Sequence, residues 1–297
     1  MRLTKAAGER IIYPMQGRGN RLTKRRGTKA MKCYACPRKC GADREKTVGF
    51  CGGGSGLKIS KIMIHRAEEP VISGRNGSGA VFFAGCALRC VFCQNADISV
   101  GGKGDIFSPE ELYEAVLRLA DEGVDNIDFI TAGHYLPQLL PVLERLKKRV
   151  SVPFIYNSGG YESVAAIRAL DGLIDVYLPD FKYASNELAA KFSGAPDYPE
   201  IATAAIGEMC RQRGEYREEN GLVKSGVIIR HLVLPGHRDD SKAVMRVIAS
   251  KFPSAKVSVM RQYTPAFNRS EYPELNRNVT SFEYDDAVRE TVRLGLE

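Results

Sequence analysis

The chain has 297 residues, of which 44% are hydrophobic and 26% charged, a composition typical of a globular protein. No stretch approaches the roughly 20 apolar residues that a membrane span needs, and the N-terminal residues MRLTKAAGER lack the apolar core of a signal peptide. We therefore expect a cytoplasmic protein with no membrane partner.

The net charge of +8 comes from the first 30 residues, which hold nine basic residues and one acidic residue. Residues 31–297 carry 34 residues of each sign, so the folded body is formally neutral and binding to nucleic acid is not expected. We interpret residues 1–30 either as a disordered basic tail or as a translated leader, because Met31 stands just before the first cysteine as an alternative start.

Next in chain order comes a cysteine-rich segment, residues 31–74, in which Cys33, Cys36, Cys40 and Cys51 are closely spaced. Close spacing without a secretion signal indicates metal or cluster ligation rather than disulfides. The segment is too short for a core of its own, so a bound metal would supply folding energy. Two interpretations remain open, a closed tetrahedral zinc site and an auxiliary iron–sulfur cluster that relays electrons. We expect LKISKIMIH, residues 57–65, to form a β-hairpin.

From about residue 75 onward, short apolar runs alternate with segments of helical period. The runs are near-continuous, as expected of parallel strands buried on both faces, and they lie at 80–85, 126–133, 152–158, 174–181, 226–234 and 255–263. Ser108, Pro109 and Glu111 form a capping box that opens one helix, and further helices are expected at 136–149, 161–170, 197–213, 239–252 and 281–295. Six such units suit a doubly wound sheet or a partial barrel, and we predict a partial (β/α)6 TIM-like barrel over residues 75–297.

The second set of cysteines follows the first predicted strand, in the segment GCALRCVFCQN. Cys86, Cys90 and Cys93 are spaced CxxxCxxC, and three thiolates leave one iron of a 4Fe-4S cluster open for another ligand. A zinc loop that borrows a fourth ligand, or three buried thiols, is the alternative. The remaining cysteine, Cys210, is expected to be a buried thiol.

The CxxxCxxC loop, with Phe92 before its third cysteine, resembles the radical S-adenosylmethionine (SAM) superfamily. The segment EEPVISGRNGSGAVFFAGCALRCVFCQN is similar to the start of pyruvate formate-lyase activating enzymes, and above all to paralogues that carry the same N-terminal CxxCPRxCG module. The resemblance implies an oxidoreductase that binds a 4Fe-4S cluster on Cys86, Cys90 and Cys93. It also implies that the enzyme reductively cleaves SAM to a 5′-deoxyadenosyl radical, which abstracts hydrogen.

The same resemblance implies where SAM binds. In the activating enzymes an L-D-x-K stretch contacts the cofactor, and LPDFK places Asp180 and Lys182 there. The R-x-x-V-x-P-G stretch of these enzymes is matched by RHLVLPG, whereas their Gly-Gly-Glu motif is replaced by TAGH. Catalytic groups of barrels gather at the carboxyl ends of strands. The expected SAM contacts are therefore Phe92, Thr131, His134, Asn157, Ser158, Asp180, Lys182 and His237.

Three functions are compatible with these motifs. The first is activation of a glycyl-radical enzyme, with a flavodoxin or ferredoxin as the electron donor. The second is radical SAM chemistry on a different peptide or a small molecule. The third is a zinc-stapled binding protein, in which zinc ions bound by both cysteine sets only stabilise the fold.

Overall fold

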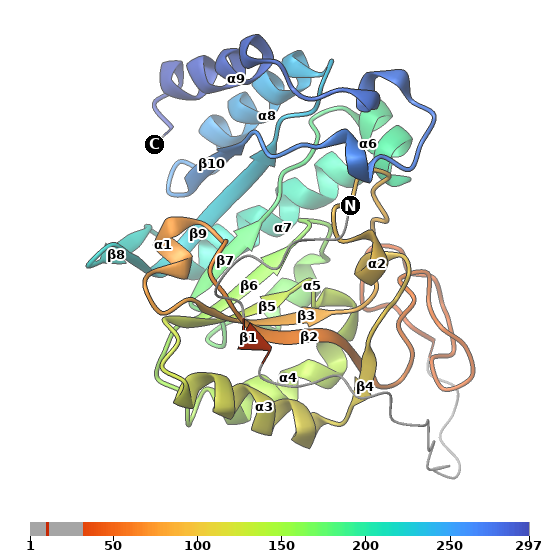
Figure 1. Cartoon of the computed structure of the whole chain (residues 1–297), viewed down its shortest axis with the longest axis vertical. Helices are drawn as coiled ribbons and strands as arrows, with labels where there is room; N and C mark the ends of the chain where they lie inside the picture. Colours follow the sequence, from red (N-terminus) through yellow and green to blue (C-terminus); the bar gives the residue numbers. More distant parts are fainter. Residues whose placement is uncertain (1–9, 12–31, 297) are drawn as a thin grey trace.

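The computed structural model describes residues 10–11 and 32–296. Six parallel strands form the centre of the molecule (Figure 1): β3 (Ser78–Phe83), β5 (Asn126–Ile130), β6 (Phe154–Ser158), β7 (Val176–Pro179), β9 (Leu222–Leu232) and β10 (Lys256–Met260). They pair in this order, and all six lie where the apolar runs predicted strands. Because β10 pairs, within the described residues, with β9 alone, the sheet stays open. This confirms the predicted partial (β/α)6 barrel.

Antiparallel strands extend the sheet beyond β3. Strand β2 (Leu57–His65) pairs with β3, and it also pairs with β1 (Arg10–Ile11) and β4 (Asp105–Phe107), while β8 (Arg217–Glu219) pairs with β9. The expected hairpin within residues 57–65 is wrong, because this segment is one continuous strand. Its central polar pair, Ser60 and Lys61, lies at a β-bulge opposite β3 instead of forming a turn.

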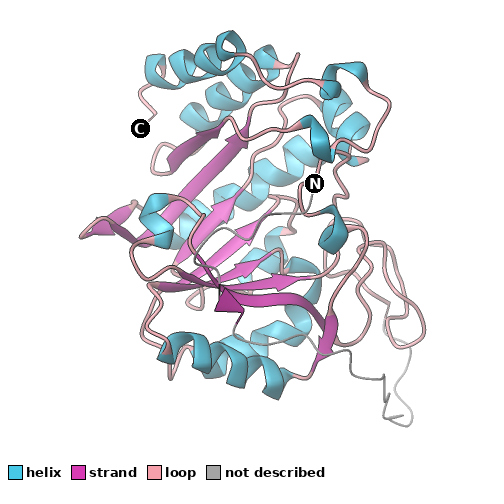
Figure 2. Ribbon diagram, viewed as in Figure 1, coloured by secondary structure: helices cyan, strands magenta, loops and turns pink. Residues whose placement is uncertain are grey.

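Helices pack beside the strands, as Figure 2 shows. Figure 1 places α3 (Pro109–Asp121) and α4 (Leu136–Leu146) at one end of the row of strands, and α8 (Arg238–Lys251) and α9 (Ser281–Arg293) at the other. The remaining helices are α1 (Pro70–Ser73), α2 (Ala96–Ser99), α5 (Val164–Arg168), α6 (Asn186–Ser193) and α7 (Tyr198–Arg213). The expected capping box at Ser108 and Glu111 is present at the start of α3.

Two apolar cores result from this arrangement. The larger core lies between the helices and the sheet, and it includes Leu112 of α3 and Phe129 of β5. A smaller core joins Ile72 of α1 to side chains of β6, β7 and β9, including Ile155 and Ile228. Helix α1 therefore packs against the face of the sheet that the smaller core covers, next to β9.

Residues 32–56, which contain the first four cysteines, consist of turns and a single bridge between Lys32 and Asp43. The proposed division of the chain at residues 31–74 and 75–297 remains a prediction, and β2 lies in the main sheet rather than in a separate module. We therefore use the name cysteine module for residues 32–56 alone. Apart from Arg10 and Ile11, the basic tail lies outside the described residues.

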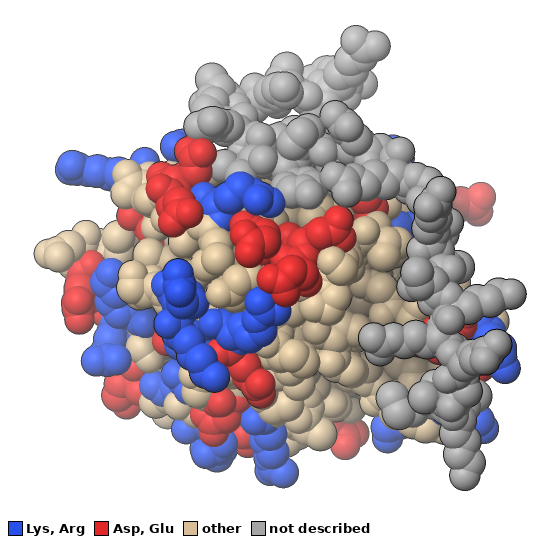
Figure 3. Space-filling view, turned by 90° about the horizontal axis from the view of Figure 1, so that it is seen from below, with Lys and Arg blue, Asp and Glu red and all other residues tan. Residues whose placement is uncertain are grey.

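The surface carries charges of both signs. On the face shown in Figure 3, Lys and Arg side chains are interspersed with Asp and Glu, in agreement with the balanced charge of residues 31–297. None of the described helices is long and apolar enough to cross a membrane.

Candidate functional site

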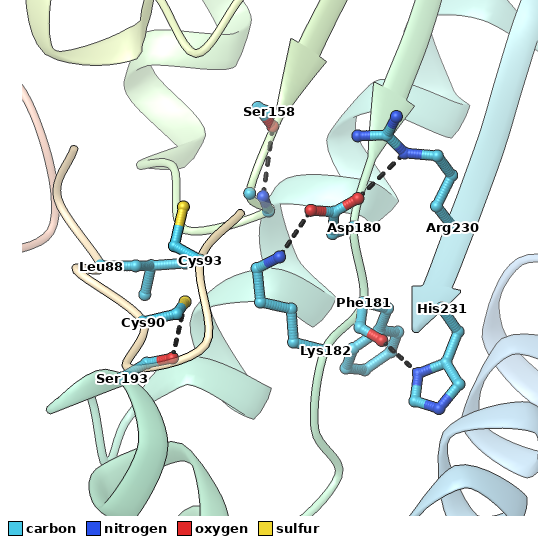
Figure 4. Close-up of polar contacts among 12 residues, drawn as sticks. Leu88, Cys90, Cys93, Ser158, Asp180, Phe181, Lys182, Ser193, Arg230 and His231 are labelled. Atoms are coloured by element: carbon cyan, nitrogen blue, oxygen red, sulfur yellow. Dashed lines mark hydrogen bonds and ion pairs between the residues drawn. The ribbon is translucent and has the colours of Figure 1, made fainter. Parts of the chain in front are cut away.

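The loop after β3 carries the three cysteines of the CxxxCxxC motif. Gly85, with a φ of +92°, turns the chain out of the sheet, and Cys86, Cys90 and Cys93 follow within one short loop. Figure 4 shows Cys90 and Cys93 on this loop, opposite the ends of the strands. We call residues 85–95 the three-cysteine loop.

Segments from elsewhere in the chain hold the main chain of this loop. The N–H of Val91 donates to the carbonyl of Phe192 at 2.9 Å, and the carbonyl of Val91 accepts from the N–H of Arg269, also at 2.9 Å. The guanidinium of Arg269 donates to the carbonyl of Cys90 at 2.6 Å. The loop is thus fixed from two sides, by α6 and by the segment that precedes α9.

Each sulfur of the loop accepts a hydrogen bond. The donors are Leu88 N–H to Cys86 (3.4 Å), Ser193 Oγ–H to Cys90 (2.9 Å) and Ser99 Oγ–H to Cys93 (3.3 Å). Burial, together with the neighbouring Cys90, raises the pKa of Cys86 to about 12. Burial therefore disfavours the free thiolate, and a bound metal would take the place of the proton.

The donor set fits an iron–sulfur cluster. All eight cysteines of the chain are free thiols, so Cys86, Cys90 and Cys93 are not committed to disulfides. In residues 10–11 and 32–296, no group of three or more His, Cys, Asp or Glu side chains is gathered closely enough to hold a single metal ion. A 4Fe-4S cluster is a larger group that takes each cysteine sulfur on a different iron, and three cysteines leave its fourth iron for another ligand.

Opposite the loop, the ends of β7 and β9 present a network of charged groups (Figure 4). Asp180 accepts from Arg230 Nε at 2.9 Å and pairs with Lys182 Nζ at 2.6 Å. Arg230 also donates to Asn157 Oδ1 at 2.7 Å and pairs with Glu68 at 3.2 Å. The guanidinium thus organises three neighbouring oxygen groups through its planar array of donors.

The charges of this network shift the pKa values of its own members and of the nearby Cys90. Burial raises the pKa of Asp180, but the charges of Arg230 and Lys182 outweigh burial and hold the pKa below its ordinary value. Lys182 keeps its proton, because Asp180 raises its pKa against the effect of burial. Burial likewise raises the pKa of Cys90, while the nearby ammonium of Lys182 lowers it. The network and the three-cysteine loop therefore share one electrostatic environment.

Asp128 of β5 lies at the buried end of the network. It is fully buried, and burial raises its pKa well above the ordinary value. One carboxyl oxygen accepts from Asn157 at 3.3 Å, and the other has no hydrogen-bond partner among the described residues. Asp128 lies in the middle of the apolar run at 126–133, so no local pattern marks it as a site residue.

Several expected SAM contacts lie together at these strand ends. Asn157, Asp180 and Lys182 belong to the charged network, and Ser158 is adjacent, with its Oγ accepting from a backbone N–H at 3.2 Å. Thr131 follows β5 with a φ of +54°, and its N–H donates to the carbonyl of Asn157 at 2.8 Å. A non-glycine residue at this φ is uncommon and is typical of a constrained site.

Three other expected contacts lie apart from the charged network. Phe92 is buried and packs edge-to-face against Phe192 and Tyr263. The ring of His237 lies edge-to-face on Phe192, at 5.2 Å between centroids. His134 is buried beside the cysteine module, where its Nε2 lies 2.9 Å from the carbonyl oxygen of Ala84, and burial lowers its pKa to about 4. It is therefore a neutral imidazole.

The cysteine module packs directly on the three-cysteine loop and on the segment after β5. Cys36 and Cys51 are buried, Cys33 is half-buried and Cys40 is exposed. The Cys51 sulfur accepts from Gly53 N–H at 3.4 Å and from Arg44 at 3.5 Å. The guanidinium of Arg44 also donates to the carbonyl of His134, so the module is fixed to the body of the protein.

Three polar residues near the site are distant in the chain from the cysteine loop or the strand-end motifs and were not predicted as site residues. Ser193 ends α6, Glu68 precedes α1, and Glu162 follows β6, where burial raises its pKa to about 8. Ser193 and Glu162 lie outside the recognised motifs, and Glu68, the first residue of the EEPVISG stretch, was not singled out as a site residue. Their positions depend on how α6 and the segment before α1 pack, which local sequence does not report.

Comparisons with known proteins agree with this geometry. A family model described as the radical SAM superfamily matches residues 80–248. An uncharacterized protein of Methanocaldococcus jannaschii is 31% identical over 275 residues, which cover 89% of this chain and 75% of that protein. The pyruvate formate-lyase-activating enzyme of Clostridium pasteurianum is 26% identical over 240 residues, or 75% of this chain and 91% of that enzyme.

Among solved structures, Streptococcus suis SuiB bound to the precursor peptide SuiA aligns with a TM-score of 0.50 and 10% identity, over 70% of this chain and 44% of SuiB. This likeness shows the fold alone. The chain spans between 44% and 59% of the length of four solved structures that it matches.

Proposed function

Because the chain belongs to the radical SAM superfamily, whose cofactors are a 4Fe-4S cluster and SAM, we propose that it is a radical SAM enzyme with both bound at the three-cysteine loop. Cys86, Cys90 and Cys93 hold the cluster, and its open iron binds SAM. When bound, the reduced cluster supplies the electron that breaks a carbon–sulfur bond of SAM and leaves the 5′-deoxyadenosyl radical.

One observation carries this proposal. The three cysteines spaced CxxxCxxC lie on a single fixed loop, each with a hydrogen-bonded sulfur, and Figure 4 shows Cys90 and Cys93 facing the charged strand ends. Lys182, which is paired with Asp180, lies near enough to Cys90 to lower the pKa of its thiol, and this supports assigning the loop and the network to one site. A zinc-stapled binding protein would not need this charged network.

The residues at the strand ends bind and orient SAM in this proposal. SAM carries an ammonium, a carboxylate, ribose hydroxyls and a sulfonium, so it needs both charged and hydrogen-bonding partners. The ionised carboxylate of Asp180 and the ammonium of Lys182 supply the charges, and Asn157, Ser158 and Thr131 supply polar groups around them. We propose that Phe92, His134 and His237 complete the pocket, as the resemblance implies.

For the substrate, we propose a glycine of a glycyl-radical enzyme, from which the adenosyl radical abstracts hydrogen. The 26% identity to a pyruvate formate-lyase-activating enzyme supports this choice. The partners are then a glycyl-radical enzyme and, as electron donor, a flavodoxin or ferredoxin. The alternative is radical chemistry on another peptide or a small molecule. The test is anaerobic incubation with glycyl-radical proteins of the same organism, in which a glycyl radical in the electron paramagnetic resonance (EPR) spectrum supports activation.

The first test of the radical chemistry is reconstitution under anaerobic conditions. We expect the wild type to release 5′-deoxyadenosine from SAM under dithionite, and the Cys86→Ala/Cys90→Ala/Cys93→Ala variant to release none. Cys210→Ala is the matched control, because Cys210 belongs to neither cysteine set, and it should behave as the wild type. Equal release by the triple variant and the wild type would refute the assignment.

The same proposal includes a second metal site. We propose that Cys33, Cys36, Cys40 and Cys51 ligate zinc or an auxiliary iron–sulfur cluster, because the cysteine module has no core of its own and a bound metal supplies folding energy. Counting zinc, iron and sulfide in the triple variant separates the two, since only this site remains.

A further inference from the structure

The cysteine module exposes large apolar side chains to solvent. Tyr34, Val48 and Phe50 are 61%, 64% and 38% exposed, and they are three of the seven large hydrophobic residues that are exposed in the described part of the chain. Because the module comprises only residues 32–56, exposed apolar surface is concentrated here rather than scattered over the molecule. Concentrated apolar surface flanked by polar residues is typical of a site that binds another protein.

The module is also the basic part of a body that is otherwise slightly acidic. Residues 32–50 carry five basic and two acidic side chains, whereas residues 51–297 carry 29 basic and 32 acidic side chains. The exposed basic residues Lys32, Lys39 and Lys46 alternate along the chain with the exposed apolar ones. Apolar side chains among basic ones are complementary to a partner protein whose binding face is acidic.

Arg89 of the three-cysteine loop extends this surface. It directly precedes Cys90, it is exposed, and its φ is +60°. Lys39 of the module is likewise exposed, with a φ of +42°. A residue other than glycine is strained in this left-handed conformation, and such strain is typical of functional positions. The guanidinium of Arg89 donates to the carbonyl of Phe50 and lies 4.5 Å from the centroid of its ring, so Phe50 joins the module to the loop at the surface.

Arg38 holds Phe50 and the three-cysteine loop in one rigid unit. Its guanidinium lies 4.4 Å from the ring centroid of Phe50 on the module. The same guanidinium donates to the carbonyl of Ala87 at 2.7 Å and to that of Ser193 at 3.0 Å. The surface is therefore preformed, and binding of a partner needs little further ordering of side chains.

From these observations we propose that Tyr34, Lys39, Val48, Phe50 and Arg89 form a docking surface for an acidic one-electron carrier protein of the flavodoxin or ferredoxin class. The proposal rests on the proposed function, because the carrier must find a cluster on the three-cysteine loop to reduce. It does not depend on which metal the cysteine module binds.

The position of the docking surface favours an electron carrier over a substrate protein. Cys90 and Cys93 face the charged strand ends (Figure 4), where SAM binds in the proposed function, whereas Arg89 reaches the module. A substrate must reach the strand ends, because hydrogen abstraction requires contact with the adenosyl radical. An electron needs no such contact, and a carrier at Arg89 stands one residue from a cluster ligand. One electron then leaves the reduced carrier and enters the cluster, and no bond is made or broken.

A matched pair of variants tests the docking surface. Val48→Asp places a negative charge among the basic side chains, and Val292→Asp makes the same change on α9, at a valine that is 72% exposed. We expect Val48→Asp to lower the second-order rate of cluster reduction by reduced flavodoxin at least about tenfold, as is typical when a central contact residue is lost. Val292→Asp should match the wild type. Dithionite, a small reductant that needs no docking surface, should reduce all three proteins at the same rate.

The salt dependence of the flavodoxin reaction tests the charge complementarity. In the wild type, raising the ionic strength from about 0.01 M to about 0.5 M should slow the reaction, because salt screens the attraction between the basic surface and the acidic carrier. Lys39→Glu should slow the reaction at low salt and weaken its salt dependence. Lys148→Glu, at an exposed lysine that follows α4, should behave as the wild type. Equal salt dependence in Lys39→Glu and the wild type would overturn the proposal.

The remaining outcomes separate this proposal from the proposed function. Equal flavodoxin rates in Val48→Asp and Val292→Asp overturn the docking surface. So does failure of both flavodoxin and ferredoxin to reduce a wild-type cluster that dithionite reduces. Slower glycyl-radical formation by Val48→Asp under dithionite also overturns it, because the surface would then bind the substrate protein. Cluster reduction is measured by stopped-flow absorbance without SAM, so a cluster that accepts electrons but never cleaves SAM refutes the proposed function alone.

Discussion

Replacing Gly85 by alanine tests the contact between the cysteine module and the three-cysteine loop. At Gly85 the φ of +92° strains any side chain, and the added Cβ would also overlap the carbonyl oxygen of Cys51. Gly52, with a φ of +81°, provides the matched control, because a Cβ there meets no heavy atom of the described residues within 4 Å. The two variants share the backbone strain and differ in the overlap.

The expected free-energy cost of each variant is the sum of backbone strain and steric overlap. Backbone strain costs about 1–2 kcal/mol in each variant. In Gly85→Ala the overlap also separates Cys86 N–H from the Cys51 carbonyl, which adds about 0.5–1.5 kcal/mol for the hydrogen bond and about 1 kcal/mol or more for the displaced atoms. The contact should therefore open more easily by about 2 kcal/mol in Gly85→Ala than in Gly52→Ala, or about 30-fold in the equilibrium constant.

Hydrogen exchange measures this opening directly. The amide of Cys86 should exchange about 30-fold faster in Gly85→Ala than in Gly52→Ala, while amides in the centre of the sheet keep equal protection in both variants. Equal exchange at Cys86 in the two variants would show that the carbonyl of Cys51 does not hold this amide, and the argument for a fixed contact would fail.

Three further predictions concern the site itself. Ser193→Ala removes the hydroxyl that donates to Cys90, and because hydrogen bonds to cluster sulfurs raise the reduction potential, an EPR-monitored titration should show a lower potential. Arg230→Met removes the buried guanidinium that pairs with both Glu68 and Asp180 and should cost about 3–5 kcal/mol in urea denaturation, whereas Arg246→Met removes an arginine that is 57% exposed, from a Glu290 that keeps Arg293, and should cost at most about 1 kcal/mol. Burial raises the pKa of Asp128, so its contribution to stability is complete below about pH 3.9 and declines as pH rises through the raised pKa. Asp128→Asn, which cannot ionise, should therefore gain stability relative to the wild type from pH 4 to 8, and a constant difference would contradict the buried neutral carboxyl.

The parallel strands and most of the helices could be predicted because each one has a recognisable local sequence pattern, such as an apolar run or a capping box. The run at 226–234 is apolar enough to mark β9, and Ser108 with Glu111 marks the start of α3. The hairpin predicted within residues 57–65 is wrong, because the nine-residue β2 pairs with β3, which lies farther along the chain, and not with itself. Local pattern predicts an extended segment, but it does not reveal which strand pairs with it.

The part of the site that lies in short sequence motifs could be predicted from the spacing of residues in those motifs. The CxxxCxxC motif marked the loop, and LPDFK marked the ion pair of Asp180 and Lys182. Spacing did not predict that Ser193 would donate to Cys90, nor that Cys51 would contact Cys86. Those contacts join residues that are far apart in the chain, so they depend on packing that no single segment specifies.

The segment before α1 has a mechanical consequence for the open barrel. Glu68 pairs with Arg230 of β9 at 3.2 Å, and Glu69 accepts from Ser258 of β10 at 2.7 Å, so this segment ties the β2 side of the sheet to its far edge. It bridges the open side of the barrel, between β2 and the β9–β10 edge. Any movement of this segment away from the sheet must break the pair of Glu68 with Arg230, which also holds Asp180. Widening of the barrel and the position of Asp180 are thereby coupled through one guanidinium.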